Sequence, residues 1–299
     1  MEKFTSLHCK VLTLYILYDI LRKIIIVGFG MEESEKALEF PLLLDKDIHG
    51  NDLIVFQANK LIRAHKDDLS LLEAKFLRLV ISQIVKEDKD FKTYTCTSSQ
   101  LAKFFDISPT DVAAELRSIG DSLLKKMIYI EKENGKGFWH FQWVSSIKYD
   151  NGIITVKINE ELKDYLLGLD RLFTAYGYEV IMGFNSDRSI KLFELLSSYA
   201  NMGIRDRDWK QPGIPEYVNL QRHEYAFRIE YLRSFFGCEN KYALTRDFLK
   251  FVIGESLKII NRNTLINATY RTVRNGKRIE YVVFRVLTPP SEMKNIRSK

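Results

Sequence analysis

A repeated order of secondary-structure elements constrains the fold more than any other feature of this sequence. Apolar periodicity and turn residues predict a helix, a strand, a short helix, a turn, a long helix and a β-hairpin, and this order recurs in the second half of the chain. Subtracting residue numbers gives a constant offset of 131, by which Tyr94, Leu101, Phe104 and Phe105 correspond to Tyr225, Leu232, Phe235 and Phe236. Coincidental helical periodicity is the alternative, but the shared order of elements favours an internal duplication.

The first copy is expected to span residues 53–150. In chain order we expect strand Leu53–Gln57, helix Asn59–His65, a helix that begins after Ser70, strand Lys92–Thr97, short helix Gln100–Phe105, helix Thr110–Lys126, and strands Met127–Glu131 and Phe138–Lys148. Ser70-Leu71-Leu72-Glu73 has the spacing of a capping box. Ser98 or Ser99 can cap the short helix, and the loop Lys132–Gly137 would form the turn of the hairpin.

The second copy is expected to span residues 186–290. Its expected elements are helix Ser189–Ala200, the polar loop Met202–Asn219, strand Tyr225–Ile229, short helix Glu230–Phe236, the turn Gly237–Asn240, helix Tyr242–Asn261, and strands Leu265–Arg274 and Lys277–Leu287. Asn275-Gly276 between the last two strands is a strong hairpin signal, because both residue types tolerate a positive φ.

The interval 151–185 between the copies is expected to be a connector. Asp150-Asn151-Gly152 predicts a hairpin turn into strand Ile153–Ile158, and helix Glu160–Leu167 and the aromatic stretch Phe173–Phe184 follow. The interval lacks the Ser, Pro and Gly content of a flexible linker, so we expect it to be packed. Residues 291–299 would form a C-terminal tail.

A helix-turn-helix followed by a hairpin wing is the element order of a winged helix. The repeated order therefore predicts an α+β fold of two tandem winged-helix domains related by internal duplication.

The leader, residues 1–52, admits two interpretations. Val11–Val27 is strongly apolar, but charged residues interrupt it and no signal-peptide cleavage site follows it. Glu33 stands where the third glycine of a dinucleotide-binding fingerprint belongs, which argues against a nucleotide loop. Either the segment is an amphipathic helix on a membrane or partner, or the natural protein starts at Met31, leaving residues 1–30 an upstream extension. The polar sequence after Met31 favours the second interpretation, so we expect no membrane association.

The distribution of charge favours an acidic partner for the second copy. The formal net charge is +6 and the pI is about 9.0. From Ser186 to Lys299 there are 21 Lys and Arg against 12 Asp and Glu, a net charge of +9, whereas Met1–Asn185 carries −3. Nucleic acid is the commonest acidic partner of such a basic region.

The candidate DNA-binding residues lie on two elements of the second copy. They are Lys241, Tyr242, Thr245, Arg246 and Lys250 on the second helix of the helix-turn-helix, and Arg271, Arg274, Lys277 and Arg278 around the wing tip. Arg246 can donate two hydrogen bonds to guanine, whereas the lysines suit phosphates. A solvated hairpin with ordinary surface cations is the alternative for the wing. The corresponding window of the first copy contains Asp111 and Glu115 and would be repelled by phosphate.

Catalytic chemistry is not expected. The five histidines include no pair with metal-ligand spacing, and no Gly-x-x-x-x-Gly-Lys-Ser/Thr loop is present. A rolling-circle nuclease, which needs a His-x-His pair, is therefore disfavoured, and we expect no enzyme activity, metal or cofactor. Cys9, Cys96 and Cys238 are widely spaced and indicate a reducing cytoplasm, which we take to be bacterial.

From Leu53 to Leu287 the sequence resembles the iteron-binding, theta-type plasmid replication initiators. The resemblance rests on five segments: Ala58–Ile62, Leu69–Lys75, Ser189–Leu196, Tyr242–Asn261, and the wing Asn275–Arg278. The apolar leader departs from that family's pattern.

The resemblance implies a C-terminal domain that reads an origin repeat in the major groove and an N-terminal domain that contacts the DNA backbone and carries a dimer interface. It implies that monomers bind iterons, that dimers repress the initiator's own promoter, and that the protein opens the origin with host initiator and helicase proteins as partners. A tandem winged-helix transcription regulator is the alternative function.

Overall fold

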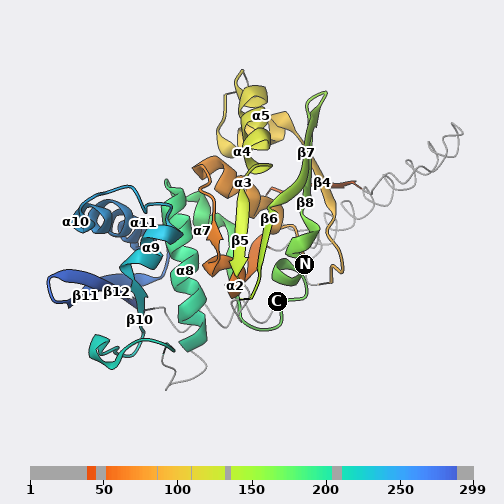
Figure 1. Cartoon of the computed structure of the whole chain (residues 1–299). Helices are drawn as coiled ribbons and strands as arrows, with labels where there is room; N and C mark the ends of the chain where they lie inside the picture. The colour runs from red at the N-terminus through yellow and green to blue at the C-terminus, as the bar shows by residue number, and fades with distance from the viewer. Residues whose placement is uncertain are drawn as a thin grey trace, which may run out of the picture. The chain divides into compact units, whose positions relative to one another are not determined.

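The structure is a computed structural model that describes residues 39–44, 52–85, 87–108, 110–131, 136–203 and 211–287. Most of the expected leader, the alternative start at Met31, the loop residues 132–135 and the tail 291–299 lie outside these ranges. The described elements form two halves, with helix α8 between them (Figure 1).

The first half contains nine strands and most of the helices of the described chain. In chain order its main elements are β1 (Glu39–Pro41), β2 (Ile54–Ala58), α2 (Asn59–Arg63), β3 (His65–Lys66), α3 (Leu71–Ile81), β4 (Thr93–Thr97), α4 (Ser98–Phe105), α5 (Val112–Leu123), β5 (Met127–Glu131), β6 (Phe138–Gln142), β7 (Val144–Asp150), β8 (Ile153–Ile158), α6 (Lys163–Leu166), β9 (Phe173–Gly177) and α7 (Tyr178–Met182). The strands form sheets of order β1-β4-β8-β7, β3-β5-β6 and β2-β9.

The second half begins with the long helix α8 (Asp187–Gly203). It continues with β10 (Glu224–Arg228), α9 (Ile229–Phe235), α10 (Thr245–Phe248), a π-helical turn (Leu249–Gly254), α11 (Glu255–Asn263), β11 (Asn267–Asn275) and β12 (Arg278–Leu287). Its sheet has the order β10-β12-β11, with antiparallel pairing throughout.

Local capping boxes set the N-termini of α3 and α4. The capping box of α3 is confirmed, since Ser70 Oγ accepts from the Glu73 amide at 3.2 Å and Glu73 Oε2 accepts from the Ser70 amide at 2.7 Å. The cap expected at Ser98 or Ser99 is wrong by one residue. Helix α4 begins at Ser98, so Thr97 is the capping residue and forms a second capping box with Gln100.

The wing of the first half differs from the hairpin expected from the sequence. The expected strand Phe138–Lys148 breaks at the buried Trp143 into β6 and β7, which belong to different sheets. The hairpin β7–β8 pairs with β4 as β11–β12 pairs with β10, so β7–β8 is the topological wing. Its turn at Asn151-Gly152 has φ values of 46° and 77° and corresponds in topology to the turn at Gly276-Lys277 between β11 and β12.

This change of wing also alters the division of the chain. The boundary expected at 150/151 falls within the turn between β7 and β8. Strand β8 pairs with β4 and β7, and β9 pairs with β2. The interval 151–185, expected as a connector, therefore supplies strands to the sheets of the first half.

The duplication extends to hydrogen bonds in the two helix-turn-helix turns. Strands β4 and β10 begin 131 residues apart, by subtraction of 93 from 224. In each half the first helix ends in a residue of positive φ, Asp106 (55°) and Gly237 (56°). The following amide reaches back five residues, from Ile107 to Ala102 O at 2.8 Å and from Cys238 to Arg233 O at 2.7 Å. This is the hydrogen bond of a Schellman motif, and its repetition supports the duplication.

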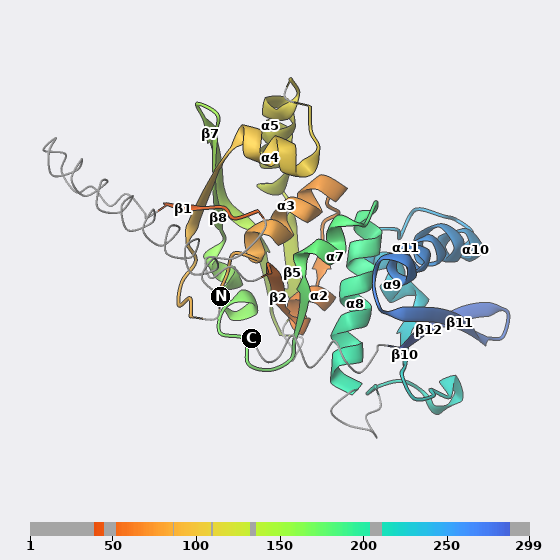
Figure 2. The same cartoon turned by 180° about the vertical axis from the view of Figure 1, so that it is seen from behind.

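Helix α8 is buried on all sides along most of its length, and both halves pack against it (Figure 2). Its apolar residues Ile190, Phe193, Leu195 and Leu196 are buried, as expected. Its buried charges are paired, because Lys191 Nζ lies 2.7 Å from Asp68 Oδ1 and Glu194 contacts Arg78. A helix with both its apolar and its polar faces covered is a rigid support between the halves.

The end of α2 and the loop that follows it contact the second half directly. The Arg63 guanidinium lies over the Tyr199 ring at 3.7 Å and donates to the Ser198 carbonyl at 2.7 Å. Tyr231 Oη donates to the Arg63 carbonyl at 3.3 Å. On the same loop, Asp68 packs against Gly237 of the helix-turn-helix turn. The position of that turn therefore depends on the first half.

Replacing Gly237 by alanine is expected to lower the free energy of unfolding by about 1–2 kcal/mol. Gly237 has a left-handed φ, and an added Cβ would lie 2.5 Å from Asp68 Oδ2, a carboxylate that Lys191 holds in place. Denaturant unfolding of the full chain measures the loss. Gly168→Ala is the matched control, because Gly168 has a φ of 59° with no atom within 4 Å of an added Cβ. Equal losses for the two variants would contradict a role for the Asp68 contact.

Candidate nucleic-acid interface

The second helix of the C-terminal helix-turn-helix begins later than the sequence predicts. Its expected start at Tyr242 is wrong, because Tyr242 has a φ of 55° and cannot form part of a right-handed helix. Leu244 is the N-cap, and the helix begins at Thr245. The chain then continues without a break through α10, the π-helical turn and α11 to Asn263.

The π-helical turn keeps one face of this helix exposed along its length. The buried positions recur every four residues, at Phe248, Val252, Ser256 and Ile260 and at Leu249, Ile253 and Leu257. In an α-helix of 3.6 residues per turn, positions four residues apart are rotated by about 40° from one another around the helix axis. A π-helical turn contains more residues per turn than an α-helical one and therefore offsets this rotation. Such turns are frequent at functional sites. The exposed face therefore stays continuous from Arg246 to Lys258.

Three of the predicted residues lie on the helix itself. Arg246 is exposed, with 81% of its side chain accessible, and its Nε lies 3.4 Å from Asp247 Oδ1. Lys250 is exposed, and its Nζ lies 4.9 Å from the centroid of the Phe251 ring. Thr245 is half-buried in the first turn. An exposed arginine one turn from an exposed lysine can offer donors to a base edge and a phosphate together.

Lys241 and Tyr242 lie on the turn before the helix, and other arginines hold that turn. Tyr242 is half-buried, and its hydroxyl accepts from Arg188 Nη1 at 2.9 Å. The Arg233 guanidinium donates to the Lys241 carbonyl at 2.8 Å and the Tyr242 carbonyl at 2.9 Å. Lys241 Nζ stays exposed, 3.8 Å from Asp68 Oδ2. Lys241 can therefore face a ligand, whereas Tyr242 fixes the turn.

The wing cations fall into two groups. Arg274, Lys277 and Arg278 are exposed at the tip of β11–β12, where Arg274 Nη1 donates to the Lys277 carbonyl at 3.1 Å. Arg271 lies further down the strand and is engaged internally. Its Nη2 lies 2.8 Å from Glu224 Oε2 and also donates to the carbonyls of Val218 and Asn219. This hydrogen bond from Arg271 lowers the pKa of Glu224 below its ordinary value. Arg271 therefore braces the loop before β10.

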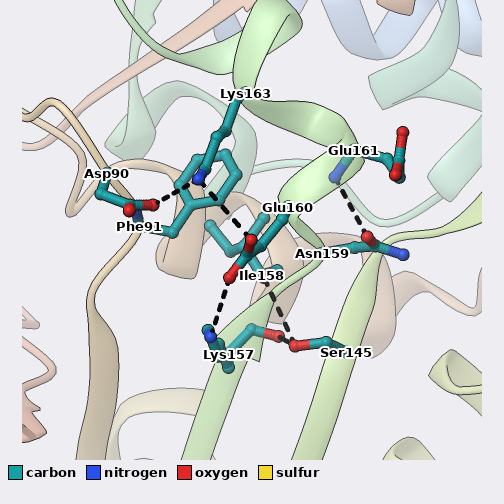
Figure 3. A network of polar contacts seen from close by, with 9 residues as sticks. All are labelled: Asp90, Phe91, Ser145, Lys157, Ile158, Asn159, Glu160, Glu161 and Lys163. Atoms are coloured by element: carbon teal, nitrogen blue, oxygen red, sulfur yellow. Dashed lines mark hydrogen bonds and ion pairs between the residues drawn. The ribbon is translucent and has the colours of Figure 1, made fainter. Parts of the chain in front are cut away.

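The first half presents a different surface at the equivalent elements. The exposed face of α5 includes Asp111 and Glu115, and the tip of its wing includes Asp150. At one corner of this half, two lysines are engaged with carboxylates (Figure 3). There Lys163 Nζ lies 2.9 Å from Asp90 Oδ1, and Lys157 Nζ lies 3.1 Å from Glu160 Oε1. The hydrogen bond from Lys163 lowers the pKa of Asp90. By contrast, Lys277 and Arg278 form no ion pair with any residue that the structure describes.

Sequence reasoning missed three residues of this interface. Arg188 and Arg233 position the turn, and Phe251 adds an exposed aromatic ring to the helix face. The two arginines carry no local signal, because their partners are backbone carbonyls or a tyrosine reached only in the fold. The exposure of Phe251 could have been predicted from the sequence, because Phe251 belongs to neither of the two sets of buried positions spaced four residues apart.

Features that would indicate a metal centre or a membrane anchor are not found within the described ranges. No group of three or more His, Cys, Asp or Glu side chains there could hold a metal ion. Nor does any helix of that part of the chain have the length and apolar composition that crossing a bilayer requires.

Two family models match this chain. The model described as Initiator Replication protein, WH1 matches residues 54–197, and the model described as Initiator Rep protein, WH2 matches residues 228–286. Together they cover more than half of the chain. This chain belongs to the initiator replication protein family. The two winged-helix domains predicted from the repeated element order are thereby confirmed, and this initiator carries its exposed basic helix and wing in the WH2 domain.

Three solved structures are similar to this chain, and the first of them shows the same fold. The Pi initiator protein in a complex with iteron DNA matches with a TM-score of 0.56 and 14% identity, over 80% of this chain and 98% of that one. The WH1 domain of MSBI1.176, a replication protein isolated from a multiple sclerosis patient, matches 31% of this chain and 75% of its own length at 19% identity and a TM-score of 0.26. Domains 2 and 3 of RctB match 73% of this chain and 80% of theirs at 9% identity and a TM-score of 0.39.

Proposed function

We propose that this protein initiates plasmid replication by binding repeated origin sequences, or iterons, through its WH2 domain. The observation that carries the proposal is the continuous exposed face of α10, the π-helical turn and α11 beside a wing tip of three exposed cations, in a member of the initiator family. A helix of this kind fits the major groove, and a cationic hairpin fits the adjacent backbone. The complex of the related Pi initiator with iteron DNA makes directly repeated sites the first ligand to test.

Within this proposal each predicted residue has a role that follows from its contacts. Arg246 donates to a base edge, and Lys241 and Lys250 contact phosphates on either side. Arg274, Lys277 and Arg278 contact the backbone or a narrow groove from the wing. Tyr242, Thr245 and Arg271 act mainly by fixing the turn, the first helical turn and the base of the sheet.

The WH1 domain supports binding in another way. Acidic residues on the exposed face of α5 oppose deep entry into a groove, so we infer that this domain contacts the backbone elsewhere and carries the dimer interface. Monomers would then bind iterons, and dimers would repress the initiator's own promoter. Origin opening and the recruitment of host initiator and helicase proteins in the bacterial cytoplasm complete the proposed role, which requires no catalysis by this chain.

The decisive experiment compares two duplexes of equal length and composition in a gel-shift titration with the full chain. One carries direct repeats of about 20 base pairs, roughly two helical turns, from the DNA that flanks the gene, and the other carries the same bases shuffled. We expect at least about 10³-fold tighter binding to the repeats. Equal affinity for both duplexes would contradict the proposal. Protection of one promoter site, with no binding to repeats, would identify a transcription regulator instead.

A further inference from the structure

Phe251 is an exposed aromatic residue in the middle of the proposed recognition helix. Its side chain is 48% accessible, while its neighbours Val252 and Ile253 are fully buried. It follows Lys250 and belongs to the face that the π-helical turn keeps exposed. An exposed phenylalanine among cations adds nothing to phosphate binding, so its presence on this face calls for an apolar ligand.

The Phe251 ring is held in place from two sides. The Tyr242 ring stacks beside it, with centroids 6.4 Å apart and an interplanar angle of 26°. Lys250 Nζ lies 4.9 Å from the Phe251 centroid. Tyr242 is itself fixed, because its hydroxyl accepts from Arg188 Nη1 and the Arg188 guanidinium lies 5.7 Å from its ring. An aromatic side chain with a fixed orientation loses little conformational entropy when it contacts a ligand.

The major groove offers one apolar group that such a ring can recognise. Thymine alone among the four bases places a methyl group, at C5, on the floor of the major groove, and phenylalanine is among the side chains that contact it. Polar donors such as Arg246 cannot detect this methyl group. We propose that Phe251 reads a thymine methyl group in the major groove, as a specificity-determining residue alongside Arg246. This inference rests on the proposed DNA-binding function.

The test removes the methyl group and nothing else. The full chain first selects its preferred sequence from a library of random 22-base-pair duplexes. Each thymine of the selected duplex is then replaced, one at a time, by deoxyuridine, which pairs identically but lacks the C5 methyl group. For the wild-type chain we expect one position at which the replacement weakens binding about fourfold, the effect of losing one apolar carbon contact. For Phe251→Ala we expect weaker binding to the thymine duplex and no further loss at that position.

Two further variants make the result specific. Phe251→Leu keeps an apolar contact and should keep part of the thymine preference. Leu265→Ala removes a side chain of similar exposure (54%) that lies off the helix face, and it should leave the deoxyuridine pattern unchanged. Matching thermal midpoints establish that the variants are folded.

The failure of this inference is distinguishable from the failure of the proposed function. If no sequence is selected, the proposed sequence-specific binding fails, and the reading of thymine fails with it. If a sequence is selected but deoxyuridine affects the wild type and Phe251→Ala equally at every position, DNA binding stands and the role of Phe251 is overturned.

Discussion

Replacing Arg78 by alanine is expected to lower the free energy of unfolding by about 3–5 kcal/mol, the usual loss when one partner of a buried ion pair is removed. Arg78 and Glu194 are almost inaccessible to solvent, and two hydrogen bonds of 3.1 and 2.9 Å join their side chains. Glu194 also accepts from Gln57 and Tyr176, so it is the centre of a buried network between α3, α8 and two strands. Without Arg78 the buried carboxylate would lose its ion-pair partner and keep only Gln57 and Tyr176 as hydrogen-bond donors.

Urea unfolding of the full chain measures this loss. Lys163→Ala is the matched control, because it breaks a pair with Asp90 that is open to solvent and contributes little. A loss for Arg78→Ala no larger than that of the control would contradict the prediction.

The pH dependence of stability is a second readout of the same pair. Burial alone would raise the pKa of Glu194, but the Arg78 guanidinium outweighs burial and holds this pKa below the ordinary value of 4.5. A group with a depressed pKa in the folded state stabilises the fold above its unfolded pKa, and that stability is lost as the pH falls through the folded value. Below about pH 4.5 the wild-type chain should therefore lose stability more steeply than Glu194→Gln.

Local signals in the sequence were sufficient for most of the elements. The capping box at Ser70 and the hairpin turn at Asn151-Gly152 depend only on residues a few positions apart, and the structure confirms both. The hairpin expected at Asn275-Gly276 also forms, but its turn residues are Gly276 and Lys277, because Asn275 pairs with Arg278. The constant offset of 131 likewise reflects two chain segments with equivalent hydrogen bonds.

The errors occurred where tertiary contacts decide the structure. Alternation of apolar residues continues through Trp143, so the sequence shows one strand where the chain passes from one sheet to another. The fold buries Trp143 at this junction, and its ring also lies 5.7 Å from the Arg78 guanidinium. The wing of the first half was misassigned for the same reason, because sheet partners cannot be read from alternation alone.

The candidate site shows the same limit at the level of single side chains. Charge counting directed attention to the second half, but it treats all cations there alike. Only the fold distinguishes Arg271, whose donors are bound by Glu224 and backbone carbonyls, from Lys277, which is exposed at the wing tip. It also moves Tyr242 from the helix to the turn before it.

Arg246→Ala is expected to weaken binding to the selected DNA by about 1–3 kcal/mol and to relax the preference at one base position. The Arg246 side chain is 81% accessible, and its contact with Asp247 is long at 3.4 Å, so its guanidinium is free to turn toward a guanine edge. Gel-shift titrations against the selected duplex and its single-base variants measure both effects. Loss of the same size on every variant duplex would show that Arg246 contacts only the backbone.

Lys277→Ala provides the contrasting result, because a cation at the wing tip neutralises phosphate whatever the base sequence. It should weaken binding to all duplexes equally and reduce the slope of log affinity against log salt concentration by about 1. Lys157→Ala is the control, since Lys157 lies in the first half and is paired with Glu160. If Arg246→Ala and Lys277→Ala changed base preference and salt slope alike, the assignment of base reading to the recognition helix and of phosphate contact to the wing would be wrong. If only the first changes base preference and only the second changes the slope, the exposed face kept continuous by the π-helical turn is the part of this initiator that reads sequence.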